Sequence, residues 1–216
     1  MKTDEINQGM VSRIIEVAKQ VFVKKGYEAT KMGDIAAEVG ISRTAMHYYF
    51  RTKEMMFEAI LRQLTGNILP NIDAIMNEES TILEKLPKII DTYLTALRHN
   101  PLFPLFALNE LNRNPKHLFN AIIKDNKNIQ PMIRLRKQVE EEMQKGLINN
   151  ISVIDIISTL LGTILFPLLA KNVLVQVFMN GETEAFNDFI ANRKQFIYHI
   201  MYALLSPKQA PVVDFK

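Results

Sequence analysis

Residues 30–50 read TKMGDIAAEVGISRTAMHYYF, and this stretch decides the fold prediction. Its first apolar residues recur at the spacing of one helix face, which predicts a short amphipathic helix: Ile35, Ala36 and Val39. Gly40 stands where the chain must reverse, because glycine adopts a positive φ without steric cost. Ser42 can then cap a second short helix by accepting from a backbone N–H two or three residues later. The stretch therefore predicts two helices joined by a glycine turn, which is the plan of a helix-turn-helix.

The second of these helices carries residues that can contact DNA, because the second helix of such a motif enters the major groove. Arg43 is the best candidate for reading a base, since its planar guanidinium can hold guanine O6 and N7 together. Tyr48 and Lys53 suit phosphates, one through a hydroxyl and the other through a point charge. The alternative is that the polar residues only face solvent on an ordinary helix. The residues expected at the DNA are Lys31, Arg43, Thr44, Ala45, His47, Tyr48, Tyr49 and Lys53.

The positive charge of the chain is concentrated around this motif. The whole chain has 216 residues and a formal net charge of +3. Residues 1–53 contain nine Lys and Arg against six Asp and Glu, whereas the remainder is balanced. This excess is small, but its position agrees with a surface that faces phosphates.

Helices are expected almost throughout, and no strand pattern is present, so the predicted fold class is all-α with about nine helices. Thr81 and Glu84 fit a capping box, and Ser152 can cap the long apolar helix of the last third. Beyond the motif, the expected helices span about residues 9–25, 53–68 with a kink or end at Pro70, 81–99, 101–114, 115–146 as one broken or two helices, 152–178, and 183–205.

The sequence resembles the TetR family of bacterial transcriptional regulators. The resemblance covers residues 8–68 and rests on Gly26 to Thr30, Asp34 to Ala36, Gly40 to Ser42 and Tyr48 to Glu54. It implies a three-helix DNA-binding head, a connecting helix and a larger helical body that dimerises and often binds a small molecule. Thr44 and His47 depart from the commonest pattern, which puts in doubt any operator sequence taken from relatives.

This resemblance and the helix pattern together predict the domain organisation. We expect a helix-turn-helix domain at residues 1–52, with the motif at 31–50, and a dimerisation and effector domain at 53–206. Residues 207–216 are expected to form a loose tail, because Ser206 and Pro207 end the last helix.

The apolar run from Ile156 to Ala170 is expected to lie in a homodimer interface. It has fifteen residues without a charge, which is short of the roughly 18–20 needed to cross a bilayer, so no membrane partner is expected. By analogy with the family, this helix and the last one pack against their copies; the alternative is an intramolecular core. The residues expected at the interface are Ile157, Leu161, Ile164, Leu168, Phe189, Phe196 and Ile200.

A pocket for an apolar small-molecule effector is expected among the body helices. Methionine is flexible and polarizable, which suits adaptable apolar sites, although such residues at helical spacing are more often core. The candidate lining residues are Tyr93, Phe103, Phe106, Phe119, Met132, Met143 and Phe166.

Catalytic and cofactor motifs find no support in the sequence. The four histidines are scattered without a metal-ligand spacing, and glycine-rich phosphate loops and nucleophile elbows are missing. The chain has no cysteine, which fits a reducing cytoplasm, and the residues at its start lack the apolar segment of a signal peptide. We therefore expect a cytoplasmic protein with no metal and no cofactor, and not an enzyme.

These observations predict a sequence-specific DNA-binding regulator. On family analogy it is a repressor, released from a pseudo-palindromic operator by an effector. The alternatives are a helical binding or scaffolding protein whose motif no longer contacts DNA and, with less support, an α-helical enzyme.

Overall fold

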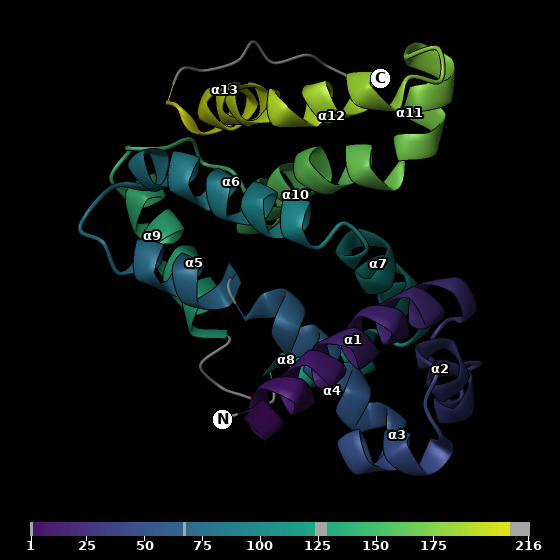
Figure 1. The fold of residues 1–216 in the computed structure, drawn as a ribbon. Helices are drawn as coiled ribbons and strands as arrows, with labels where there is room; N and C mark the ends of the chain where they lie inside the picture. Colours follow the sequence, from purple (N-terminus) through teal and green to yellow (C-terminus); the bar gives the residue numbers. More distant parts are fainter. Residues whose placement is uncertain (1, 67, 124–128, 208–216) are drawn as a thin grey trace. The chain divides into compact units, whose positions relative to one another are not determined.

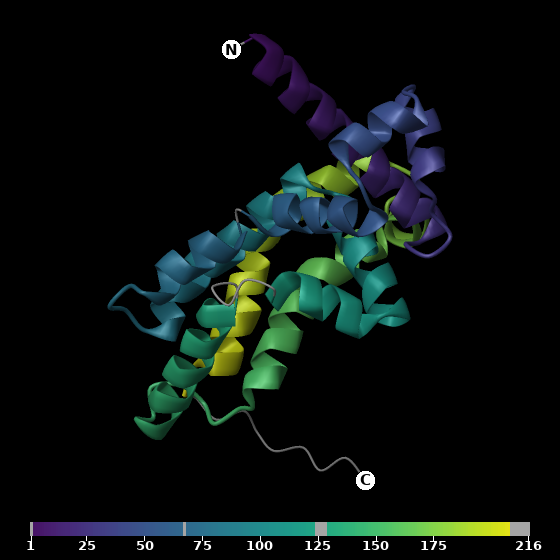
Figure 2. The ribbon, with the colours of Figure 1, turned by 90° about the horizontal axis from the view of Figure 1, so that it is seen from below.

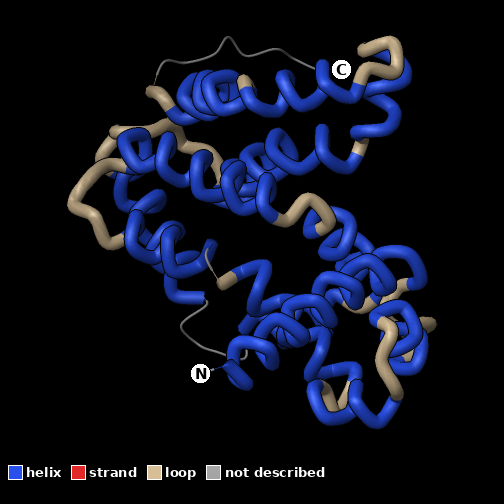
Figure 3. Tube along the Cα trace, viewed as in Figure 1, coloured by secondary structure: helices blue, strands red, loops and turns tan. Residues whose placement is uncertain are grey.

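The structure, a computed structural model, describes residues 2–66, 68–123 and 129–207. Within these ranges it contains thirteen helices and no strand, so the all-α prediction is confirmed (Figure 1, Figure 3). The predicted number of about nine helices is too low, because several stretches expected to be single helices are divided. The predicted loose tail falls almost wholly outside the described residues.

The chain forms two compact units, and each is described by itself. The helices of unit 1 come from residues 1–67 and 100–126: α1 (Lys2–Lys25), α2 (Met32–Val39), α3 (Arg43–Tyr49), α4 (Lys53–Thr65), α7 (Phe103–Arg113) and α8 (Pro115–Ile123). The helices of unit 2 come from residues 68–99 and 127–216: α5 (Ile68–Met76), α6 (Ile82–His99), α9 (Gln130–Gln144), α10 (Val153–Leu169), α11 (Lys171–Phe178), α12 (Thr183–Ala191) and α13 (Arg193–Leu205). The predicted boundary falls after residue 52, directly after the motif. The compact unit that contains the motif extends further and also includes α4, α7 and α8.

Unit 1 is held together by one apolar core to which all six of its helices contribute. Aromatic rings lie at its centre: the ring of Phe57 lies 6.2 Å from that of Phe22 and 5.3 Å from that of Phe106. Such pairs bury large apolar areas and add specific ring contacts. Because Phe57 belongs to α4 and Phe106 to α7, their burial explains why these helices join the unit that contains the motif.

Several helix ends follow the sequence signals. Thr81 Oγ1 accepts from the N–H of Glu84 at 3.3 Å, and the Glu84 carboxylate accepts from the N–H of Thr81 at 2.8 Å, which confirms the capping box. Ser152 caps α10 by accepting from the N–H of Asp155 at 3.1 Å. The first helix extends further than expected, since it begins at Lys2 instead of about residue 9.

Unit 2 is built around α6, which packs against α5, α9 and α13. Helices α6 and α13 lie side by side in both ribbon views (Figure 1, Figure 2). Their apolar faces supply much of the core of this unit: Ile82, Leu86, Ile89, Ile90, Leu97, Ile197, Met201 and Leu205. Helix α6 contains Pro87 as its sixth residue, where proline cannot donate the N–H that would otherwise bond to the carbonyl of Leu83.

The stretch expected to form one helix from Ser152 to Phe178 consists of α10 and α11, which meet at Ala170 and are bent by 67°. Among the described residues no single helix is long and apolar enough to cross a membrane, and α10 with α11 meets that criterion only as a bent pair. Helix α11 has no buried residue. The final helix is divided in the same way, into α12 and α13.

Candidate nucleic-acid interface

Helices α2 and α3 form the predicted helix-turn-helix, and the turn between them has the predicted geometry. Gly40 has φ 79° and ψ 34°, the left-handed region that favours glycine. Its N–H donates to the carbonyl of Ala37 at 3.1 Å, and the N–H of Ile41 donates to the carbonyl of Ala36 at 3.0 Å. These bonds satisfy the carbonyls of Ala36 and Ala37 near the end of α2 as the chain reverses.

Helix α3 is capped at its N-terminus and packs against the core of unit 1 through one face. Ser42 Oγ accepts from the N–H of Ala45 at 3.1 Å, as predicted. Met46 and Phe50 are buried in the core of unit 1, with 1% and 6% of their surface exposed. The opposite side consists of exposed residues, which are Arg43, Thr44, His47 and Tyr48. A side chain exposed on a short, firmly held helix is free to contact a DNA groove.

The other residues predicted at the DNA lie around this face. Lys31 is exposed just before α2, whereas Ala45 and Tyr49 are half-buried. The ring of Tyr49 packs edge-on against that of Tyr48, with centroids 5.2 Å apart. Tyr48 is the most exposed aromatic residue of the motif, at 76%. The structure thus brings seven of the eight predicted residues to one region of the unit.

The side chain of Lys53, the eighth predicted residue, makes its contacts within unit 1. Its Nζ donates to the carbonyls of Tyr27 at 2.8 Å and Glu28 at 3.2 Å, and lies 4.3 Å from the centroid of the Tyr27 ring. These contacts hold the turn after α1 against the start of α4. Local sequence patterns do not reveal them, because the partners are 25 and 26 residues apart.

Asp34 places a negative charge at the start of α2, beside Lys25. Its carboxylate accepts from Lys25 Nζ at 3.0 Å and from the N–H of Lys31 at 3.3 Å. The hydrogen bond from Lys25 and that from Lys31 hold the pKa of the Asp34 carboxyl below its usual value. The carboxylate therefore stays ionised and neutralises one cation near the expected phosphate surface.

Comparison with known proteins agrees with this geometry. Residues 14–60 match the model of the bacterial regulatory proteins of the tetR family, and this segment contains α2, α3 and their turn. The match shows that residues 14–60 carry a DNA-binding segment of the tetR type. The family is one of regulatory proteins, which agrees with the prediction that the chain is not an enzyme.

The similarity to individual tetR-type relatives is strongest in the N-terminal part. The chain is 33% identical over 78 residues to the nucleoid occlusion factor SlmA of Haemophilus influenzae (strain PittGG), an alignment that covers 36% of each protein. The chain thus spans about a third of the length of that relative. It is 25% identical over 138 residues to the fatty acid metabolism regulator protein of Bacillus subtilis (strain 168), covering 62% of this chain and 71% of the other.

Solved structures share the fold over almost the whole chain. A mutant of HlyIIR, with residues 169–186 of that protein replaced by a linker, superimposes with a TM-score of 0.65 at 21% identity, covering 94% of this chain and 100% of the other. The regulator FadR from Bacillus subtilis, in complex with stearoyl-CoA, gives a TM-score of 0.60 at 19% identity, covering 88% and 96%. At these identities the likeness shows the fold alone.

The residues predicted for an effector pocket are divided between the two units. Phe103, Phe106 and Phe119 belong to unit 1, where Phe106 is buried in the core and Phe119 is exposed. The other four belong to unit 2; Tyr93 and Met143 are half-buried, whereas Met132 and Phe166 are exposed. Burial raises the pKa of the Tyr93 hydroxyl.

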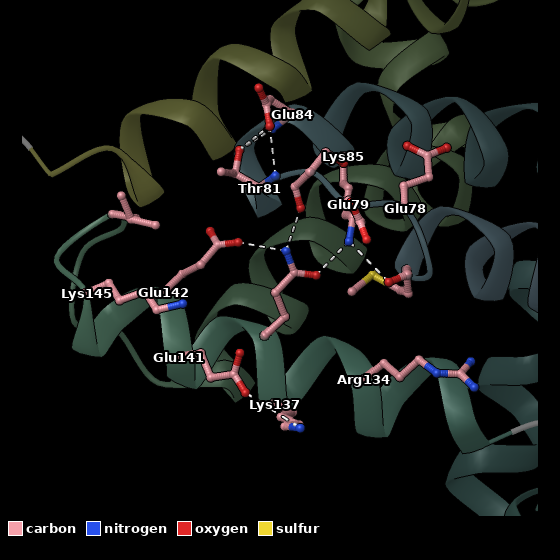
Figure 4. A pocket seen from close by; sticks show the side chains of 14 residues that line it. Glu78, Glu79, Thr81, Glu84, Lys85, Arg134, Lys137, Glu141, Glu142 and Lys145 are labelled. Carbon is pink, nitrogen blue, oxygen red and sulfur yellow. Dashed lines mark hydrogen bonds and ion pairs between the residues drawn. The ribbon is translucent and has the colours of Figure 1, made fainter.

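A groove of about 710 Å³ opens in unit 2 between the α5–α6 turn and α9 (Figure 4). Its lining is mostly charged and polar, with Met76 and Leu147 as the apolar members, and none of the seven predicted effector residues contributes to it. Two charged residues at its base are buried: Lys85 is 1% exposed and Glu142 is 5% exposed. Gln138 connects them, since its Oε1 accepts from Lys85 Nζ and its Nε2 donates to Glu142, both at 2.7 Å. This network holds the turn between α5 and α6 against α9. It was not predicted from the sequence.

The residues predicted for a dimer interface also differ in exposure. Ile164 is buried within its own unit, at 1% exposed, whereas Phe196 is 52% exposed. The other five are half-buried: Ile157, Leu161, Leu168, Phe189 and Ile200. Arg193 lies against the rings of Phe189 and Phe196, at 4.9 and 5.0 Å from their centroids. Strongly exposed apolar residues that were not predicted lie on α10 and on α11, namely Ile154, Val173, Val177 and Phe178.

Proposed function

We propose that this protein is a sequence-specific DNA-binding transcriptional regulator of the bacterial cytoplasm. The observation that carries the proposal is the exposed side of α3, where Arg43, Thr44, His47 and Tyr48 stand on a capped helix anchored by buried Met46. Arg43 and Thr44 are proposed to read bases, and Tyr48 to hold a phosphate. The match of residues 14–60 to the tetR family model supports this assignment.

The proposed functional form is a homodimer that represses transcription. Phe166, Phe178 and Phe196 of unit 2 are exposed at 64%, 73% and 52%, and a second copy of the chain would cover such apolar surface. A two-fold dimer presents two copies of α3, spaced for successive major grooves about 34–36 Å apart on a pseudo-palindrome.

We propose that an apolar small molecule releases the protein from DNA. The support is a relative with the same fold that was solved in complex with stearoyl-CoA. The ligand would act by favouring a conformation of the dimer in which the two copies of α3 are not spaced for successive major grooves. The predicted pocket residues remain candidates for its site, except that the buried packing of Phe106 favours a role in the core of unit 1.

Selection of bound sequences from random duplex DNA tests the proposal. We expect a pseudo-palindromic site, bound with a steep decrease of affinity as salt concentration rises. A selection that yields no enriched sequence would favour a helical binding protein whose motif no longer contacts DNA.

Arg43→Ala is expected to weaken binding to the selected site by about 1–3 kcal/mol and to relax the preference at one base position of each half-site. The reason is that alanine cannot make the two parallel hydrogen bonds of a guanidinium to guanine. Fluorescence anisotropy with the selected duplex and its single-base variants measures both effects. Arg136→Ala, an exposed arginine on α9, is the matched control and should leave DNA affinity unchanged. Equal base preference in Arg43→Ala and the unmodified protein would show that another residue reads the base.

Lys53→Ala is expected to act mainly through stability, lowering the free energy of unfolding by about 1–2 kcal/mol. The variant loses two hydrogen bonds to backbone carbonyls and the contact with the Tyr27 ring. Thermal unfolding and DNA titration on the same samples separate this role from the phosphate contact predicted from sequence. If Lys53 binds a phosphate instead, unfolding will be unchanged and the salt dependence of binding will flatten by about one unit of slope.

A further inference from the structure

Gly33 occupies the second position of α2, where its backbone gives no reason for a glycine. The glycines of the described residues with a positive φ are Gly26, Gly40, Gly146 and Gly181, and Gly33 is not among them. With a φ in the ordinary range, alanine is a more favourable helix residue than glycine. A requirement for space therefore explains Gly33 better than a requirement for conformational freedom.

The space at Gly33 is filled by the side chain of Arg43. A β-carbon added to Gly33 would lie 2.9 Å from Arg43 Nε, 3.0 Å from Nη2 and 3.2 Å from Cζ. The first of these distances is shorter than real carbon contacts and the other two are tight, so a side chain at position 33 would shift the guanidinium, which is the mobile end of a long side chain. The first residue of α3 thus rests against the backbone at the start of α2.

The guanidinium of Arg43 lies beside Gly33 on an exposed side chain. Over the described parts of the chain, no hydrogen bond or ion pair engages it, although its neighbours in a hollow of about 240 Å³ include Lys31, His47 and Met46. All its N–H donors therefore remain available for a ligand, and the missing β-carbon of Gly33 leaves open the direction in which the side chain lies.

We infer that Gly33 is a positioning residue for DNA recognition, which sets the direction from which the Arg43 guanidinium approaches a base edge. This inference rests on the proposed function. A β-carbon at position 33 would close the direction in which the guanidinium lies, so the side chain of Arg43 would have to approach the DNA along another path. A bidentate contact with guanine also requires a fixed approach of the planar group. Gly33 contributes by leaving room, without contacting the DNA.

The test is a double-mutant cycle with Gly33→Ala and Arg43→Ala, measured on the duplex selected with the unmodified protein. We expect Gly33→Ala to weaken binding at least fivefold and to relax the preference at the base position that Arg43→Ala affects. In the Arg43→Ala background, the same change at position 33 should have less than a twofold effect. The melting temperature should stay equal or rise, because alanine favours the helix.

Gly9→Ala is the matched control, since Gly9 also lies in a helix of unit 1 and an added β-carbon there meets no atom within 4 Å. It should leave both affinity and base preference unchanged. Equal losses from Gly33→Ala in the two Arg43 backgrounds, or no loss in either, would overturn the inference while leaving the proposed function intact. Failure of the unmodified protein to select any sequence would overturn the proposed function itself.

Discussion

Glu142→Ala is expected to lower the free energy of unfolding of unit 2 by about 1–3 kcal/mol, because it leaves the buried N–H of Ile82 without its acceptor and removes a negative charge that stabilises buried Lys85. The Glu142 carboxylate accepts from the N–H of Ile82 at 3.0 Å and from Gln138 Nε2 at 2.7 Å. Lys85 Nζ donates to the carbonyl of Met76 at 3.2 Å. Burial lowers the pKa of Lys85, and the charge of Glu142 opposes this effect. Removing the carboxylate therefore destabilises α9, the start of α6 and the turn that precedes α6.

Urea unfolding gives the size of this effect, and hydrogen exchange of the Ile82 amide gives its location. Glu141→Ala is the matched control: it removes the neighbouring carboxylate, which is exposed and lies 3.7 Å from Lys137. Such a surface pair contributes at most about 0.5 kcal/mol. Combining Glu142→Ala with Lys85→Met should recover part of the loss, since both buried charges are then gone. Equal losses from the two glutamate variants would show that the buried network contributes nothing specific.

The positions of these two charged residues were readable from the sequence in principle. Lys85 lies three residues after Ile82 and one before Leu86, on the buried stripe of α6. Glu142 follows buried Val139 by three residues on α9. The periodicity that locates an apolar face thus marks both as inward-facing. It does not reveal that they meet, because their helices are far apart in the sequence.

The motif itself was predictable because its signals are local. The left-handed turn at Gly40 and the cap at Ser42 involve residues within five positions of one another, so backbone stereochemistry decides them. The exposed side of α3 follows from the burial of Met46 and Phe50, one helical turn apart. The close approach of Arg43 to Gly33 spans ten residues and the glycine turn, and no periodicity indicates it.

The breaks within long helical stretches were not predictable from the same signals. The bend of 67° falls at Ala170, three residues after Pro167, and alanine is a good helix former. The grouping of α7 and α8 with the motif depends on the packing of Phe106 and Leu118 into a core supplied by earlier helices. Tertiary packing therefore decides these features, and local preference does not.

His117 is expected to stabilise unit 1 in a pH-dependent manner. Its side chain is 16% exposed, and its ring stacks on Phe57 with centroids 4.3 Å apart. Its Nε2 lies 2.9 Å from a carboxylate oxygen of Glu54, and its Nδ1 bonds the carboxylate of Glu110. Only the imidazolium can donate from both ring nitrogens at once. The protonated form therefore joins α8 to α7 and to α4, the helix that follows α3.

The sign of the pH dependence follows from the pKa of His117. Burial lowers this pKa, but the hydrogen bonds and charges of Glu110 and Glu54 raise it more, so that in the folded state it lies above the ordinary value of 6.5. A group whose pKa is raised on folding contributes its full stabilisation below its unfolded pKa and loses it as the pH rises through the folded pKa. The contribution of His117 should therefore be largest below about pH 6.5 and should decline at higher pH.

His117→Gln is expected to lower the free energy of unfolding by about 2–3 kcal/mol at pH 6 and by about 1 kcal/mol or less at pH 9. The loss at pH 6 lies between those of fully buried and surface ion pairs, because Glu54 is half-exposed. Urea unfolding across this pH range measures it. His99→Gln is the matched control: His99 is exposed, and the contact shown for it is between Nδ1 and the carbonyl of Thr95 at 2.8 Å. Its effect should stay within about 0.5 kcal/mol at every pH. A cost of His117→Gln that does not change between pH 6 and 9 would mean that the ring acts by packing on Phe57 and not through its charge.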